Sequence, residues 1–121
     1  MKKNQKPITM EEKITLSESE IEDLHVQYYN LTSDLRQYRS LLRSRDIKKA
    51  IPEQQRNIKS QYSFFKSSLN GTLETLISQD RLRYNVAVNA LFNGFVSFRT
   101  KIQVSKYLRN IRQKKTMSWM F

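Results

Sequence analysis

The chain has 121 residues, which is enough for one domain, and its hydrophobic content of 38% predicts a small core. It contains no cysteine, which excludes disulfides and thiolate metal sites, and only two Gly and two Pro, which argues against a loop-rich or all-β protein. Its 22 Lys and Arg outnumber its 11 Asp and Glu, and the net charge of +11 favours an anionic partner: nucleic acid, lipid or acidic protein.

Residues 1–16 are expected to form an extended basic tail. Three lysines lie between Met1 and Pro7, but no apolar stretch follows them, so the start of the chain does not have the pattern of a secretory signal. No apolar run elsewhere approaches the length of a membrane span. We therefore expect an intracellular protein.

The segment 17–50 predicts one long amphipathic helix. Ser17 and Glu20 fit a capping box at its start. Apolar residues then recur at alternating spacings of three and four, which is typical of a helix packed along a seam. They are Ile21, Leu24, Tyr28, Leu31, Leu35, Tyr38 and Leu42. The helix should end near Ala50, because Pro52 disfavours helical geometry in the residue before it.

A second stripe on this helix is cationic. Arg36, Arg39 and Arg43 follow one another at spacings of three and four beside the apolar seam. The helix therefore offers an apolar edge for burial and a cationic edge for a partner. The single histidine, His25, has no second imidazole near it in the sequence, and we interpret it as structural or solvated.

A second helix should run from Pro52 to Leu69 and pair with the first as an antiparallel hairpin. Asn70-Gly71 is typical of a turn or a helix C-cap. Two alternatives remain open beyond it. A third helix begins at Thr72, or the second helix continues through Gly71.

Residues 84–105 are ambiguous between strand and helix. Apolar and polar residues alternate on both sides of Asn93-Gly94, a strong signal for a β-hairpin. However, pairing the strands across a two-residue turn would mix apolar and polar residues on each face. A helix is favoured, with one apolar stripe formed by Val88, Leu91, Phe95, Phe98 and Ile102.

The final segment, 99–121, predicts a basic helix followed by an aromatic tail, after a helical domain that spans 17–98. It carries seven cations and no acid: Arg99, Lys101, Lys106, Arg109, Arg112, Lys114 and Lys115. Such a run is a candidate site for anions or nucleic acid. A basic amphipathic helix is also typical of binding at a membrane surface.

No motif in the sequence indicates catalysis. We find no cluster with metal-ligand spacing, no glycine-rich phosphate loop and no nucleophile–base pair. We therefore expect a non-catalytic protein without a metal or cofactor.

The sequence Tyr38-Arg39-Ser40-Leu41-Leu42-Arg43 resembles the LYR-motif family of small mitochondrial adaptors, although Gln37 stands where that family has leucine. Arg56-Asn57-Ile58-Lys59-Ser60-Gln61-Tyr62 is similar to the pattern on the family's second helix. The resemblance implies a small basic helical protein of mitochondria that binds acyl carrier protein. It also implies that Tyr38 and Arg39 are the motif residues, with Arg36 and Arg43 extending the same edge.

The sequence thus predicts an all-α fold: an antiparallel hairpin extended to a three- or four-helix bundle, with an extended N-terminal tail. We expect a basic helical adaptor or structural subunit of a large assembly, such as a respiratory complex or its assembly machinery. The alternative is an RNA-contacting structural protein of a ribosome or another ribonucleoprotein.

Overall fold

The computed structural model describes residues 16–120, and side chains up to Gln113. Among these residues it contains five α-helices and no strand: α2 (Glu18–Arg43), α3 (Arg45–Lys49), α4 (Pro52–Ser78), α5 (Tyr84–Leu91) and α6 (Phe98–Met120). The predicted all-α fold is confirmed. The extended tail predicted for residues 1–16 lies outside the described residues, apart from Leu16.

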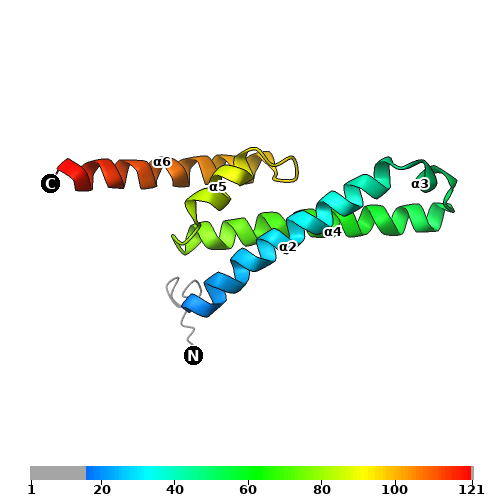
Figure 1. The fold of residues 1–121 in the computed structure, drawn as a ribbon, viewed down its shortest axis with the longest axis horizontal. Helices are drawn as coiled ribbons and strands as arrows, with labels where there is room; N and C mark the ends of the chain where they lie inside the picture. Colours follow the sequence, from blue (N-terminus) through cyan, green and yellow to red (C-terminus); the bar gives the residue numbers. More distant parts are fainter. Residues whose placement is uncertain (1–15, 121) are drawn as a thin grey trace, which may run out of the picture.

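Helices α2 and α4 form the antiparallel hairpin, and α5 and α6 lie over one end of it (Figure 1). At that end, the part of α2 up to Leu35 lies beside the part of α4 after Ser68. All four helices contribute to one hydrophobic core there. Its members are Ile21, Tyr28, Leu31, Leu35, Leu69, Leu73, Leu76, Leu82, Val86, Ala87, Ala90, Phe95, Val96, Val104, Tyr107 and Leu108.

The predicted seam of α2 is confirmed over its first half. Its members from Ile21 to Leu35 lie in the core or pack against it, and Leu24 is only partly buried. Tyr38 and Leu42, further along, are also only partly buried. The seam therefore continues past the point at which the shared core ends.

The predicted start of α2 is confirmed, but its predicted end is wrong. The capping box is confirmed, because the Glu20 backbone N–H donates to Ser17 Oγ at 3.1 Å and the Ser17 N–H to Glu20 Oε1 at 3.0 Å. The single helix predicted to Ala50 is wrong, because α2 ends at Arg43 and the short α3 follows. The Ser44 hydroxyl donates to the Leu41 carbonyl at 2.8 Å, and the Ser44 backbone is extended. This local bond competes with continuation of the helix.

Helix α4 passes through Gly71 without a break, so no separate helix begins at Thr72. A glycine inside a helix costs about 1 kcal/mol relative to alanine. On either side of Gly71, Leu69, Leu73 and Leu76 are fully buried in the core. Their burial outweighs the local cost, since each buried leucine contributes roughly 1.5–3 kcal/mol.

The helical interpretation of residues 84–105 is confirmed, but the single stripe predicted through them is wrong. A turn from Phe92 to Ser97 separates α5 from α6 and rotates α6 relative to α5. Phe98 and Ile102 are consequently exposed. The buried side of α6 is formed by Thr100, Val104, Tyr107 and Leu108.

A hydrogen bond holds this turn against α4, and another forms within the turn. The Asn70 side chain accepts the Ser97 N–H at 2.8 Å, and the buried Asn93 side chain accepts the Phe95 N–H at 2.8 Å. Asn93-Gly94 therefore does form a turn, but it joins two helices rather than two strands.

The connection from α4 to α5 is fixed to the start of α2. Ion pairs join Arg81 to Glu18 and Arg83 to Glu22. Beneath them His25 is almost fully buried, and its Nε2 accepts the Arg83 backbone N–H at 3.4 Å. Burial lowers the pKa of His25, the Arg83 charge lowers it further, and Glu22 opposes the shift. His25 is therefore a structural, neutral histidine at pH 7.

We expect the stability of the protein to fall as the pH drops below about 6.5. The unfolded chain protonates His25 at its ordinary pKa of 6.5, whereas the folded protein does so only at lower pH. Because the unfolded state then binds more protons, acid favours unfolding. Urea unfolding midpoints should decrease between about pH 7.5 and 5.5. The decrease should be smaller in His25→Gln, and equal slopes in the two proteins would contradict this explanation.

Candidate partner-binding site

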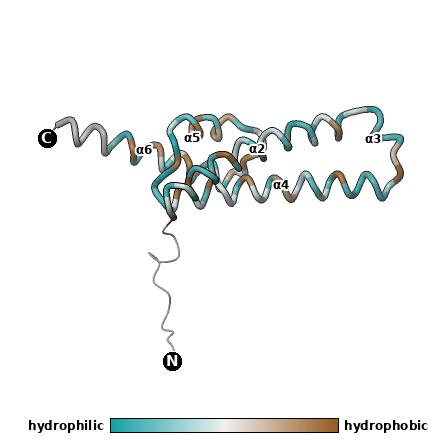
Figure 2. The backbone as a smooth tube through the Cα atoms, turned by 60° about the horizontal axis from the view of Figure 1, so that its bottom comes forward, coloured by the Kyte–Doolittle hydropathy of each residue, from teal (hydrophilic) through white to brown (hydrophobic). Residues whose placement is uncertain are grey.

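The second half of α2, α3 and the first half of α4 form a two-helix arm, residues 36–68. The arm extends away from α5 and α6 (Figure 1). No residue from 36 to 68 is buried, because a third layer covers the two helices only where Phe95 of the α5–α6 turn meets Arg39 and Tyr62. Hydrophobic segments gather where α2, α4 and α5 meet, whereas most of the arm is hydrophilic (Figure 2). The arm is therefore a surface on nearly all sides.

The arm is also strongly basic. Its sequence holds only two acids, Asp46 and Glu53, against nine cations. The cations are Arg36, Arg39, Arg43, Arg45, Lys48, Lys49, Arg56, Lys59 and Lys66. A net positive field of this size attracts anions and acidic proteins.

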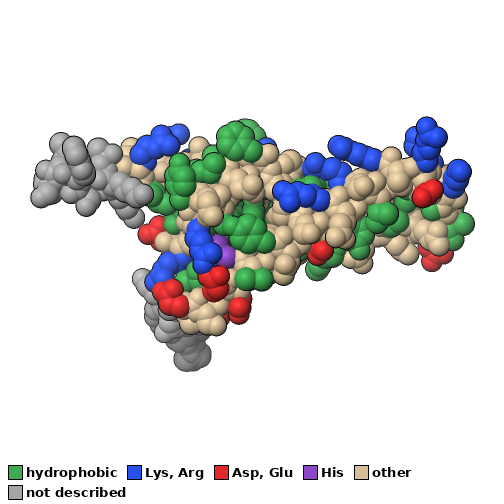
Figure 3. Space-filling view, viewed as in Figure 1, with side chains coloured by type: hydrophobic (Ala, Val, Ile, Leu, Met, Phe, Trp, Pro, Cys, Tyr) green, Lys and Arg blue, Asp and Glu red, His purple; other side chains and the backbone are tan. Residues whose placement is uncertain are grey.

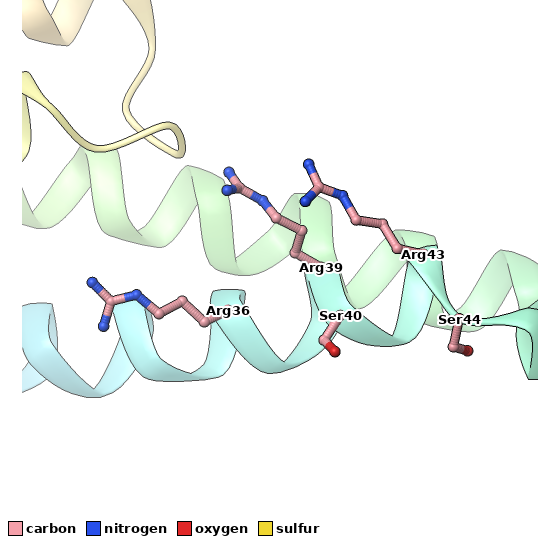
Figure 4. Close-up of a pocket in the computed structure, with 5 residues that line it drawn as sticks. All are labelled: Arg36, Arg39, Ser40, Arg43 and Ser44. Carbon is pink, nitrogen blue, oxygen red and sulfur yellow. The ribbon is translucent and has the colours of Figure 1, made fainter.

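The three arginines predicted from the sequence do share one part of the arm. Arg36, Arg39 and Arg43, together with Ser40 and Ser44, line a hollow of about 460 Å³ on α2 (Figure 4). The Arg39 and Arg43 side chains extend to the same side of the helix in that view. None of the three arginines forms an ion pair with an acid of the described residues. Their guanidinium groups thus have no carboxylate partner among the described residues, and arginine binds carboxylates or phosphates through paired hydrogen bonds.

Arg39 is held in place by the turn between α5 and α6. Its guanidinium carbon lies 3.9 Å from the centre of the Phe95 ring, a cation–π contact. A Cβ atom at Gly94 would lie only 2.9 Å from Arg39 Nη2, so the absence of a side chain there admits the guanidinium. Arg36, Arg39 and residues of this turn together line a smaller hollow of about 220 Å³. Sequence reasoning missed this contact, because the only signal was the Asn93-Gly94 turn.

Tyr38 does not accompany the arginines. It is partly buried, and its ring centre lies 5.4 Å from that of Phe65 on α4. Tyr38 therefore contributes to the packing between α2 and α4, as its seam position predicts. The structure brings together the three predicted arginines and places the fourth residue of the predicted site between the helices.

The second predicted group of cations lies on α6. Lys106, Arg109 and Arg112 are exposed, and Lys101 is partly buried. Arg99 is exposed, with its Nε 4.0 Å from Glu74 of α4. Lys114 and Lys115 lie on α6, but their side chains are outside the described part of the structure. The two predicted groups therefore belong to different helices and form two surfaces.

No group of three or more His, Asp or Glu side chains among the described residues could hold a metal ion, and no helix there is long and apolar enough to cross a membrane. Comparisons of the chain with protein-family models, with curated proteins and with solved structures found no match.

Proposed function

We propose that the protein is a non-catalytic basic helical adaptor, or structural subunit, whose arm binds an acidic protein within a larger assembly. One observation carries the proposal. The arm has no buried residue, yet it retains the amphipathic pattern of packed helices and nine cations against two acids. A partner on the arm would supply the missing layer and the missing negative charge.

The exposed apolar residues of the arm support a protein partner. Leu41, Ile51 and Phe64 are each about half exposed or more. Burying such side chains stabilises a complex, at roughly 25 cal/mol for each Å² of apolar surface removed from water. The cations would contribute mainly by speeding the encounter and fixing its orientation. The apolar and cationic side chains of the arm therefore suit a partner protein whose surface is both acidic and partly apolar.

Acyl carrier protein is our proposed partner, and the mitochondrion our proposed location. The resemblance of Tyr38-Arg39 and the following residues to the LYR motif supports both. The available guanidinium groups of Arg36, Arg39 and Arg43 suit an acidic carrier. RNA is the alternative partner, and the experiment must distinguish it from acyl carrier protein.

Charge reversal on the arm should weaken capture of the carrier. We expect the double variant Arg36→Glu and Arg43→Glu to lower affinity for acylated carrier protein by about tenfold or more, because like charges would face an acidic surface. These two arginines are preferable to Arg39, since Arg39→Glu would also break the contact with Phe95. The measurement is a pull-down, followed by titration calorimetry, with circular dichroism of each protein.

The matched control is the double variant Lys106→Glu and Arg109→Glu, which reverses two exposed cations on α6 and changes the net charge equally. It should leave carrier capture nearly unchanged. If the wild type captures no carrier, acyl carrier protein is not the partner. If instead it binds RNA through the arm, the logarithm of affinity should fall steeply with that of salt concentration, and the RNA alternative replaces the proposal.

A further inference from the structure

The last third of the chain differs from the rest in having no acid at all. Between Arg81 and Phe121 the sequence contains nine Lys and Arg and no Asp or Glu. This stretch includes all of α5 and α6. Three of these cations pair with acids of other helices: Arg81 with Glu18, Arg83 with Glu22 and Arg99 with Glu74. Further along α6, Lys106 and Arg109 are exposed, and neither α5 nor α6 presents a side-chain carboxylate that would repel an anionic surface.

The same helices expose large apolar side chains. On the helices, Phe98 is 80% exposed, Tyr84 60% and Ile102 40%, and Phe92, in the turn between them, is 85% exposed. Figure 3 shows hydrophobic side chains standing on the surface over α5 and the first part of α6, with cationic side chains beside them. Exposed aromatic rings on this scale call for an explanation, because soluble monomers rarely gather them in one region.

The outer side of α6 carries apolar side chains at its start and cations further along. Phe98, Ile102, Lys106 and Arg109 follow at spacings of four, four and three, so they share one side of the helix. The opposite side, which includes Val104, is buried against the core. The outer side of α6 therefore begins with apolar residues and continues with cations.

We propose that the face formed by α5 and α6 binds the surface of an anionic membrane. Aromatic and aliphatic side chains enter the boundary between headgroups and acyl chains, and neighbouring Lys and Arg bind anionic headgroups. An RNA surface would use the cations but would leave the aliphatic Ile102 without a role. This face adjoins the arm at Phe92, which lines one hollow with Arg36 and Arg39, but Phe98, Lys106 and Arg109 lie on α6 and not on the arm. The inference does not depend on the proposed partner.

The test is co-sedimentation of the full chain with vesicles. We expect binding to phosphatidylcholine vesicles that contain about one third phosphatidylserine, and little binding to phosphatidylcholine alone. The variant Phe98→Ser should lower the partition coefficient by about tenfold. The control Phe64→Ser removes an equally large, 63% exposed ring from the arm and should bind like the wild type.

Charge variants complete the test. The double variant Lys106→Gln and Arg109→Gln should also weaken binding, since each cation near an anionic surface contributes to attraction. No binding of the wild type to the anionic vesicles would overturn the proposal. Equal loss of binding in Phe98→Ser and Phe64→Ser would also overturn it. So would undiminished binding of Phe98→Ser together with competition by RNA, because binding would then depend on net charge alone.

Discussion

Leu35→Ala is expected to lower the free energy of unfolding by about 2–5 kcal/mol. Leu35 lies at the centre of α2, has no exposed surface and belongs to the core shared by the helices. Removing its side chain forfeits the transfer free energy of the lost atoms and leaves a cavity that the helices fill only in part. Urea unfolding followed by circular dichroism measures the change.

Leu41→Ala is the matched control, because Leu41 lies on the same helix but is about half exposed on the arm. Its loss should cost much less than that of Leu35. Equal costs at the two positions would mean that the core does not end where the structure places its boundary.

Val104→Asp should destabilise the protein as strongly, by about 3–5 kcal/mol, because an unpaired carboxylate would be buried. Val104 is fully enclosed on the inner side of α6. The substitution therefore tests whether α6 is docked on the hairpin in solution. We expect a lower urea midpoint together with exposure of apolar surface, measured by binding of a fluorescent dye.

The control for this substitution is Ile102→Asp, two residues earlier on the outer side of α6. It introduces the same charge with access to water, so the urea midpoint should change little. A stable Val104→Asp protein with unchanged dye binding would show that α6 is free of the core.

Features set by local chemistry could be predicted from the sequence. The capping box at Ser17 and Glu20 and the new helix at Pro52 depend on a few neighbouring residues, and both are present. The turn signal at Asn93-Gly94 is also real, but the single helix favoured from the sequence passes through it. Gly71 shows the limit of such reasoning. Its local preference for a break is overcome by the packing of leucines before and after it, which no local pattern states.

The orientation of α6 could not be predicted, because apolar residues occur on both of its sides. Phe98 and Ile102 compete with Val104, Tyr107 and Leu108 for the inner position. The turn after α5 decides between the two sides, and the hydrogen bond from Ser97 to Asn70 of α4 fixes that turn. A contact between distant parts of the chain thus determines which side of α6 is buried.

The candidate site was predictable only where it depends on spacing within one helix. Helical spacing alone placed Arg36, Arg39 and Arg43 beside one another, and the structure has them lining one hollow. The contact of Arg39 with Phe95 joins residues far apart in the sequence, and periodicity carries no information about it. Tyr38 had two interpretations in the sequence, and only its neighbour Phe65 shows which side of α2 it occupies.

Helix α4 has a thermodynamic consequence for the protein as a whole. Its 27 residues form one continuous helix, but only the part after Ser68 contributes fully buried side chains to the core, with Tyr62 and Phe65 packed at its edge. Local opening free energy depends on buried apolar contacts, so the arm end of this helix opens at lower cost than the core end. A ligand that binds only the closed arm would raise that cost by mass action. Binding of the proposed partner would therefore make the arm more rigid than it is in the free chain.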